Sequence, residues 1–142
     1  MNTKSTEELM NVLINTDNTT TLENVLIETE DAKTSFSEMV NSMLTEQNMT
    51  PADLQRKSGI ARTYIYQILD GTRNPGRDKV IAVALALKAD IDAAQRMLKV
   101  TGNAVLYPKD KRDAVIIFAV NKKMTVIDVN NLLESNGVGI LE

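Results

Sequence analysis

One stretch near the middle of the chain decides the fold: Leu54-Gln-Arg-Lys-Ser-Gly59-Ile-Ala-Arg-Thr-Tyr64-Ile-Tyr-Gln-Ile-Leu69-Asp-Gly71-Thr-Arg-Asn-Pro75. Gly59 separates two short segments and tolerates the positive φ that a tight turn between steeply crossing helices needs. Gly71 follows the second segment, where glycine commonly ends a helix. The apolar side chains placed to seal the two helices together are Leu54, Ile60, Ile65, Ile68 and Leu69. The stretch therefore predicts two short helices joined by a tight turn.

Helical patterns continue on both sides of this stretch. Upstream, apolar residues recur every three or four positions behind Ser35, which predicts a capped amphipathic helix. Thr50 followed by Pro51 is a preferred start for the first helix of the pair. Downstream, residues 77–88 are the most apolar segment of the chain and are expected at the centre of the core.

Together these features resemble the Cro/lambda-repressor (XRE) family over about 50 residues of the chain. The resemblance implies an all-α fold, a lambda-repressor-like helix-turn-helix bundle over residues 34–102. It also implies sequence-specific binding of double-stranded DNA, as in a transcriptional regulator, with the helix at residues 61–69 in the major groove. The family's regulators often bind two-fold operators as dimers.

The resemblance also assigns candidate DNA contacts by position. The residues expected to read bases are Arg62, Thr63, Tyr66 and Gln67. Arginine can pair with guanine O6 and N7, and glutamine can pair with adenine N6 and N7. The residues expected to contact phosphates are Thr50, Arg73, Asn74, Arg77 and Lys79, because backbone contacts come from the rims of the motif and from helix N-termini.

The composition argues against an enzyme. The chain has 142 residues with no Cys and no His, which excludes disulfides, thiol catalysis and acid–base schemes that use His. We therefore expect no catalytic residue, no metal and no cofactor. Residues 1–6 lack the pattern of a signal peptide, and the longest apolar run, residues 80–87, is too short to span a bilayer. We expect a cytoplasmic protein that does not engage a membrane.

Charge is distributed unevenly along the chain. Residues 1–47 contain two Lys or Arg against nine Asp or Glu, a net charge of −7, whereas residues 48–88 contain seven against three, a net charge of +4. The local positive charge suits a phosphate backbone although the whole chain has a net charge of −3. We expect residues 1–33 to form an acidic arm with short helices, either a solvated tail or a lid over the basic face.

An internal repeat follows the helix-turn-helix. The pattern Arg77-Asp78 through Gly102 recurs at a constant shift of 35 residues as Arg112-Asp113 through Gly137. Each copy predicts a helix, a short break and a second helix, so residues 103–142 should form a C-terminal helical hairpin. The hairpin provides either additional packing or a dimer interface, and Leu106 and Tyr107 in its leading segment are expected to be buried.

The sequence is also compatible with a second function. The same fold could serve as a protein-interaction module, with the acidic arm and the C-terminal hairpin as contact surfaces for an unidentified protein partner. The exposed face of the helix at residues 61–69 discriminates between the two functions. Hydrogen-bonding and basic side chains there favour DNA, whereas an adaptor would tolerate acidic or apolar residues.

Overall fold

Seven helices make up the part of the chain that the structure, a computed structural model, describes: residues 34–142. They are α3 (Phe36–Glu46), α4 (Pro51–Ser58), α5 (Arg62–Asp70), α6 (Arg77–Ala86), α7 (Ile91–Val100), α8 (Lys111–Asn121) and α9 (Val126–Ser135). These described residues contain no strand, which confirms the expected all-α fold. The acidic arm at residues 1–33, with its expected short helices, lies outside the described residues.

Side-chain caps determine where most of these helices begin. The Ser35 hydroxyl accepts a hydrogen bond of 3.1 Å from the backbone N–H of Glu38 at the start of α3. Thr50 and Asp53 bond reciprocally to each other's backbone N–H groups at 3.1 and 3.0 Å, which forms a capping box at the start of α4. Asp90 caps α7. The caps expected at Ser35 and Thr50 are thus confirmed.

The helix α6 is the centre of the core. All seven residues from Val80 to Ala86 are buried, so the helix is apolar on every side. A helix of this kind must be covered on every side. The helices α4, α7 and α9 contact it and provide this cover. The expected central position of residues 77–88 is confirmed.

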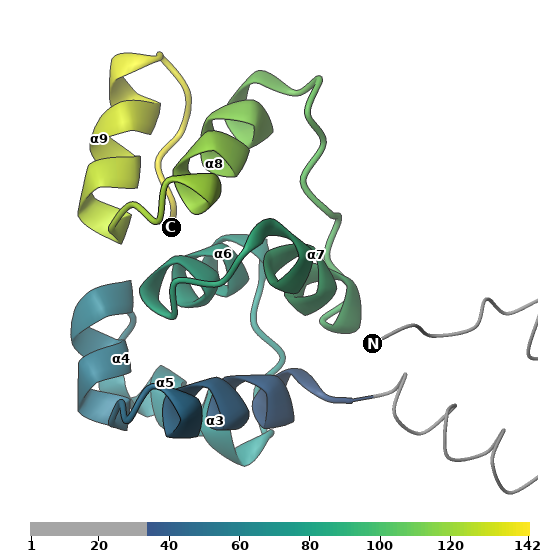
Figure 1. Ribbon diagram of the computed structural model, residues 1–142, viewed down its shortest axis with the longest axis vertical. Helices are drawn as coiled ribbons and strands as arrows, with labels where there is room; N and C mark the ends of the chain where they lie inside the picture. Colours follow the sequence, from purple (N-terminus) through teal and green to yellow (C-terminus); the bar gives the residue numbers. More distant parts are fainter. Residues whose placement is uncertain (1–33) are drawn as a thin grey trace, which may run out of the picture. The chain divides into compact units, whose positions relative to one another are not determined.

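The unit formed by Ser35–Glu142 has three layers of helices (Figure 1). The first contains α3, α4 and α5, the middle layer contains α6 and α7, and the third contains α8 and α9. Helix α5 packs against α3 and α4, and the two hairpins contact each other through α7 with α8 and α6 with α9. The helix-turn-helix and the C-terminal hairpin therefore lie on opposite sides of α6–α7.

The repeated sequence has a repeated structure. Lys88 follows the C-cap of α6 and has a φ of 55°, and Lys123 follows the C-cap of α8 and has a φ of 56°. Gly102 and Gly137, which follow α7 and α9, have φ values of 74° and 72°. Positive φ at four positions that match in pairs across the shift of 35 residues indicates that the second hairpin repeats the backbone of the first.

One expectation for the segment around residue 107 needs correction. Leu106 is buried as expected, but the Tyr107 side chain is 56% exposed. The exposure of the ring follows from the backbone, because the Tyr107 N–H donates a hydrogen bond to Asp113 at 2.9 Å. This bond turns the backbone of residue 107 toward the core, and the side chain points away from it. Arg112, near the start of α8, forms an ion pair with Asp78 at 2.9 Å. No helix in residues 34–142 is long and apolar enough to cross a membrane.

Candidate nucleic-acid interface

The turn between α4 and α5 sets the direction of α5. Gly59 ends α4 with a φ of 74°, and no atom lies within 4 Å of the position that a Cβ would take. Glycine is therefore needed because of the positive φ, and not because a larger side chain would meet a neighbouring atom. The buried Ser58 hydroxyl accepts a hydrogen bond of 3.2 Å from the Ile60 N–H, and Ile60 is buried in the core. The turn is thus fixed by one left-handed residue, one side-chain bond and one apolar anchor.

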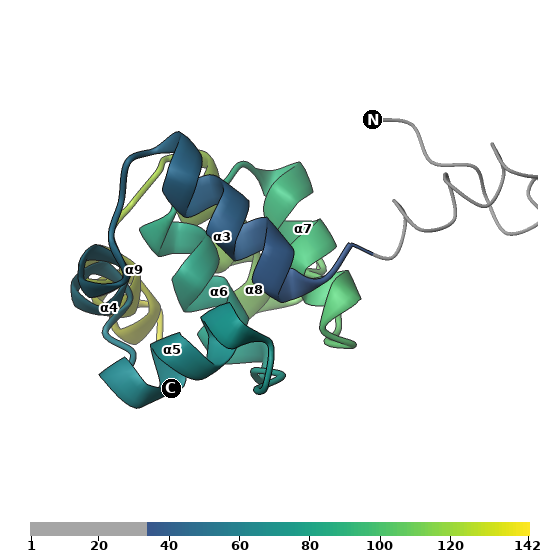
Figure 2. The same cartoon turned by 90° about the horizontal axis from the view of Figure 1, so that it is seen from below.

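Helix α5 is half buried along its length. Ile65 and Ile68 lie in the core, whereas Arg62, Thr63 and Tyr66 are exposed. Figure 2 shows α5 at the surface of the unit, with α3 and α6 on its inner side. The packing of the described residues leaves this outer surface accessible.

The candidate base-reading residues share this outer face of α5. The Arg62 guanidinium lies 5.5 Å from the centre of the Tyr66 ring, within range of a cation–π contact. Gln67 is partly buried one residue further along. The structure therefore brings Arg62, Thr63, Tyr66 and Gln67 together in the first two turns of one helix. We define these four residues as the reading face.

The electrostatics of α5 favour an anionic partner. The helix begins at Arg62 behind the N-cap residue Ala61, and no side chain of the described residues caps its first N–H groups. These groups carry the positive end of the helix dipole. The one acidic residue in α5 is Asp70 at its far end, where hydrogen bonds from the Thr72 hydroxyl and backbone N–H lower the pKa of the carboxyl. The reading face itself contains no negative side chain.

Three of the five candidate phosphate contacts keep side-chain donors that form no hydrogen bond within the described residues. Tyr64 packs against the core, and its ring lies 4.3 Å from the Arg73 guanidinium and 5.9 Å from the Lys79 ammonium. The tyrosine, in the first turn of α5, thereby holds two cations beside its ring. Thr50 is exposed at the start of α4, with its hydroxyl accepting the cap bond from Asp53. A hydroxyl in this role still has its own proton to donate.

The other two candidate phosphate contacts are held within the protein. Asn74 donates from Nδ2 to the Thr101 carbonyl at 3.0 Å. Arg77 donates from Nη1 and Nη2 to the carboxylate of Asp113 at 2.9 and 2.8 Å, and its Nε donates to the Ala104 carbonyl at 2.8 Å. Through these bonds the Arg77 guanidinium joins the helix-turn-helix to the C-terminal hairpin.

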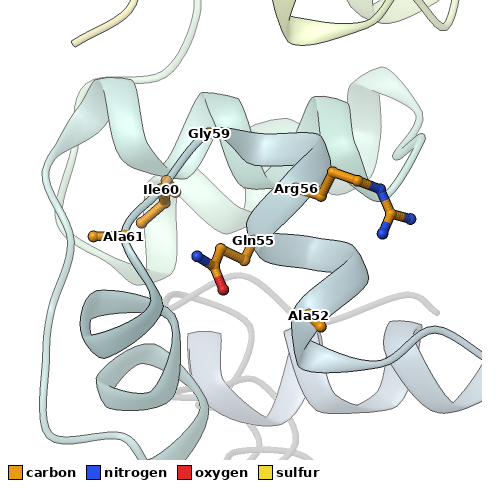
Figure 3. A pocket seen from close by; sticks show the side chains of 6 residues that line it. All are labelled: Ala52, Gln55, Arg56, Gly59, Ile60 and Ala61. Atoms are coloured by element: carbon orange, nitrogen blue, oxygen red, sulfur yellow. The ribbon is translucent and has the colours of Figure 1, made fainter.

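A shallow hollow lies beside the turn, between α4 and the start of α5 (Figure 3). Its lining residues are Ala52, Gln55, Arg56, Gly59, Ile60 and Ala61. The Gln55 side chain lies on the side of α4 that faces Ala61, whereas Arg56 extends the other way and pairs with Asp53 at 2.9 Å. Nothing in the sequence singles out Gln55, because a polar residue within α4 gives no signal of which neighbour it faces.

Comparison with known proteins identifies the central part of the chain. Residues 41–93 match the model of a helix-turn-helix family, a range that spans α4, α5 and α6 and covers less than half of the 142-residue chain. No curated protein and no solved structure matches the chain. The match confirms the resemblance that residues 50–87 show by themselves.

Proposed function

Residues 41–93 form a helix-turn-helix of the Cro/lambda-repressor type, and on this premise we propose that the protein is a sequence-specific regulator that binds double-stranded DNA. The observation that carries the proposal is the reading face. Its side chains can donate and accept hydrogen bonds, it is free of acidic residues, and no described part of the chain covers it. A major groove about 12 Å wide admits a helix with such a face.

In the proposed complex, α5 enters the major groove with its N-terminal end. Arg62 pairs with guanine O6 and N7, and Gln67 pairs with adenine N6 and N7, because these fork-shaped side chains match the edges of those bases. Thr63 and Tyr66 supply single hydrogen bonds or apolar contact on the same face. The small Ala61 leaves room for a thymine methyl beside the hollow in which Gln55 lies.

Phosphate contacts in the proposed complex come from Thr50, Arg73 and Lys79. The two cations lie against the Tyr64 ring, which reduces the entropy that each loses when it binds a phosphate. Asn74 and Arg77 are omitted because their side chains already bond within the protein. This set positions the reading face without contributing sequence preference.

The proposed organisation follows from these roles. Residues 34–102 act as the DNA-binding domain, and residues 103–142 form a hairpin that packs against it. The protein then acts by binding and not by catalysis, and its DNA partner places it in the cytoplasm or nucleoid. The acidic arm, residues 1–33, is outside the described residues and receives no role here.

Selection of duplexes from a random library by the purified full chain tests the proposal. We expect a short preferred sequence, bound with an affinity that falls steeply as salt is raised from about 50 to about 200 mM, because phosphate contacts release counterions. Selection of no sequence, together with binding that does not respond to salt, would refute DNA binding. That outcome would favour the protein-interaction module instead.

A further inference from the structure

The two hairpins contact each other reciprocally. Arg77 in α6 pairs with Asp113 in α8 at 2.8 Å, and Arg112 in α8 pairs with Asp78 in α6 at 2.9 Å. The Lys88 ammonium donates to the Lys123 carbonyl at 2.7 Å, and the Lys123 ammonium donates to the Lys88 carbonyl at 2.8 Å. In each case, one contact becomes the other when residues are exchanged with their equivalents 35 positions away.

The segments that follow α7 and α9 also form contacts that are equivalent at a shift of 35 residues. Arg77 donates from Nε and Nη2 to the carbonyls of residues 104 and 105, and Arg112 donates from the same atoms to the carbonyls of residues 139 and 140. The Leu106 N–H donates to the side chain of Gln95 at 2.8 Å, and the Leu141 N–H donates to that of Asn130 at 2.8 Å. Both leucines are buried.

Reciprocal contacts of this kind define a two-fold interface. In such an interface the same patch serves both partners, so that residue i contacts residue j and j contacts i. Here the partners are two hairpins of one chain, α6–α7 and α8–α9. The relation has a direct consequence for Arg77 and Asp78. If a second copy of α6–α7 took the place of α8–α9, Arg77 of each copy would face Asp78 of the other, and opposite charges would still meet.

We propose that the face of α6–α7 beneath α8–α9 is a surface for binding a second copy of this chain, and that the C-terminal hairpin occupies this surface within its own chain. The hairpin α8–α9 repeats α6–α7, so within the chain it takes the place that α6–α7 of a second copy would occupy. A chain whose hairpin is docked is a monomer with one reading face. When the hairpin is displaced, two chains join through α6–α7 and bring two reading faces together. Only the statement that the dimer presents two reading faces to one DNA site rests on the proposed function.

The charge pattern suggests a variant that separates the two states. Arg112→Asp combined with Asp113→Arg places like charges opposite Arg77 and Asp78 within the chain and so disfavours docking of the hairpin. It leaves Arg77 and Asp78 unchanged, so the α6–α7 face remains complementary to itself. Sedimentation equilibrium of the full chain without DNA should give the 15.7 kDa mass of one chain for the wild type and twice that mass for the variant.

The matched control reverses the charges of both hairpins. The variant R77D/D78R/R112D/D113R restores opposite charges within the chain and should return to the mass of one chain. Helix content from circular dichroism shows that each variant is folded. A folded R112D/D113R variant that keeps the mass of one chain up to about 1 mM overturns the proposal.

A milder pair and a cross-link extend the test. If R112D/D113R loses its helix content, R112Q/D113N removes the hairpin charges without repulsion, and a monomer of this folded variant up to about 1 mM overturns the proposal equally.

The chain has no cysteine, so Lys88→Cys introduces a single thiol near the two-fold axis. In the dimeric variant, a short thiol cross-linker should join two chains through position 88, whereas Thr45→Cys on α3 should give no such product. Cross-linking from position 45 alone would place the interface elsewhere and overturn the proposal.

Discussion

The ion pair between Arg77 and Asp113 should be the strongest single tie between the C-terminal hairpin and the rest of the unit. The Asp113 side chain is 8% exposed and the Arg77 side chain 25% exposed. The carboxylate accepts two hydrogen bonds from Arg77 and one from the Tyr107 N–H. Replacing Asp113 with Asn removes the charge while keeping the shape of the side chain. The change therefore isolates the electrostatic part of this contact.

The expected loss of stability in Asp113→Asn depends on the contacts that Arg77 keeps after the substitution. Hydrogen bonds to charged groups contribute about 1.5–3 kcal/mol each, and removing one partner of a buried ion pair costs about 3–5 kcal/mol because the other charge is left uncompensated. Arg77 keeps its bonds to backbone carbonyls and some contact with water, which places the value at the low end. We expect Asp113→Asn to lower the free energy of unfolding by about 3 kcal/mol. The equivalent change, Asp78→Asn, should cost less, about 1–2 kcal/mol, because both partners of that pair are about a quarter exposed.

Urea unfolding of the full chain measures these differences, and pH gives an independent check. Burial raises the pKa of Asp113, but the hydrogen bonds from Arg77 and Tyr107 and the charges of Arg77 and Arg112 outweigh burial and lower it below its ordinary value. A carboxyl with a lowered pKa in the folded state stabilises the protein above its unfolded pKa of about 3.9 and loses this effect as the pH falls toward the folded value. The difference between wild type and Asp113→Asn should therefore be full at pH 7 and shrink below about pH 4.

A double-mutant cycle with Arg77→Met tests whether the two residues act together. We expect a coupling energy of about 1–2 kcal/mol, within the range seen for residues in direct contact. Asp92→Asn on the exposed side of α7 serves as the control and should be nearly neutral. A cost below about 0.5 kcal/mol for Asp113→Asn, or a coupling energy near zero, would refute the assignment of this pair as the main tie.

Three further outcomes are expected from the helix-turn-helix. Gly59→Ala should lower the free energy of unfolding by about 1–2 kcal/mol through backbone strain alone, measured by urea unfolding, and an unchanged stability would contradict the role given to the turn. Thr50→Ala should cost about 1 kcal/mol of stability by loss of the cap, and Thr50→Ser, which keeps the hydroxyl, should cost less. Lys79→Ala should lower the slope of log affinity against log salt by about 0.9 without altering the preferred DNA sequence; a changed preference would move Lys79 from phosphate to base contact.

Local signals in the sequence predicted the helices well. Ser35 and Thr50 were recognisable as caps, and Gly59 as a turn residue, because these roles depend on the residue and its immediate neighbours. The periodic apolar residues identified the core for the same reason. The resemblance to a known family then supplied the arrangement of α4 and α5 and the positions of the reading face.

Contacts between distant segments were harder to predict. The repeated Arg-Asp pair was visible at residues 77 and 112, but the sequence did not show that each arginine bonds to the aspartate of the other copy. For the same reason, the sequence does not show that Arg77 bonds to Asp113, which lies 36 residues away. Tyr107 was misjudged because burial of its neighbour Leu106 says nothing about a side chain that points the other way.

Base reading by α5 is tested by the base preference of Arg62→Ala. Binding of the wild type and the variant is compared over all single-base changes of the selected duplex, with Lys79→Ala as the matched control for loss of one positive charge. We expect Arg62→Ala to lose about 1–3 kcal/mol of discrimination at one base pair of each site, while the other positions keep their preferences. Equal weakening for every sequence, as expected for Lys79→Ala, would show that Arg62 contacts the backbone and would contradict base reading by α5.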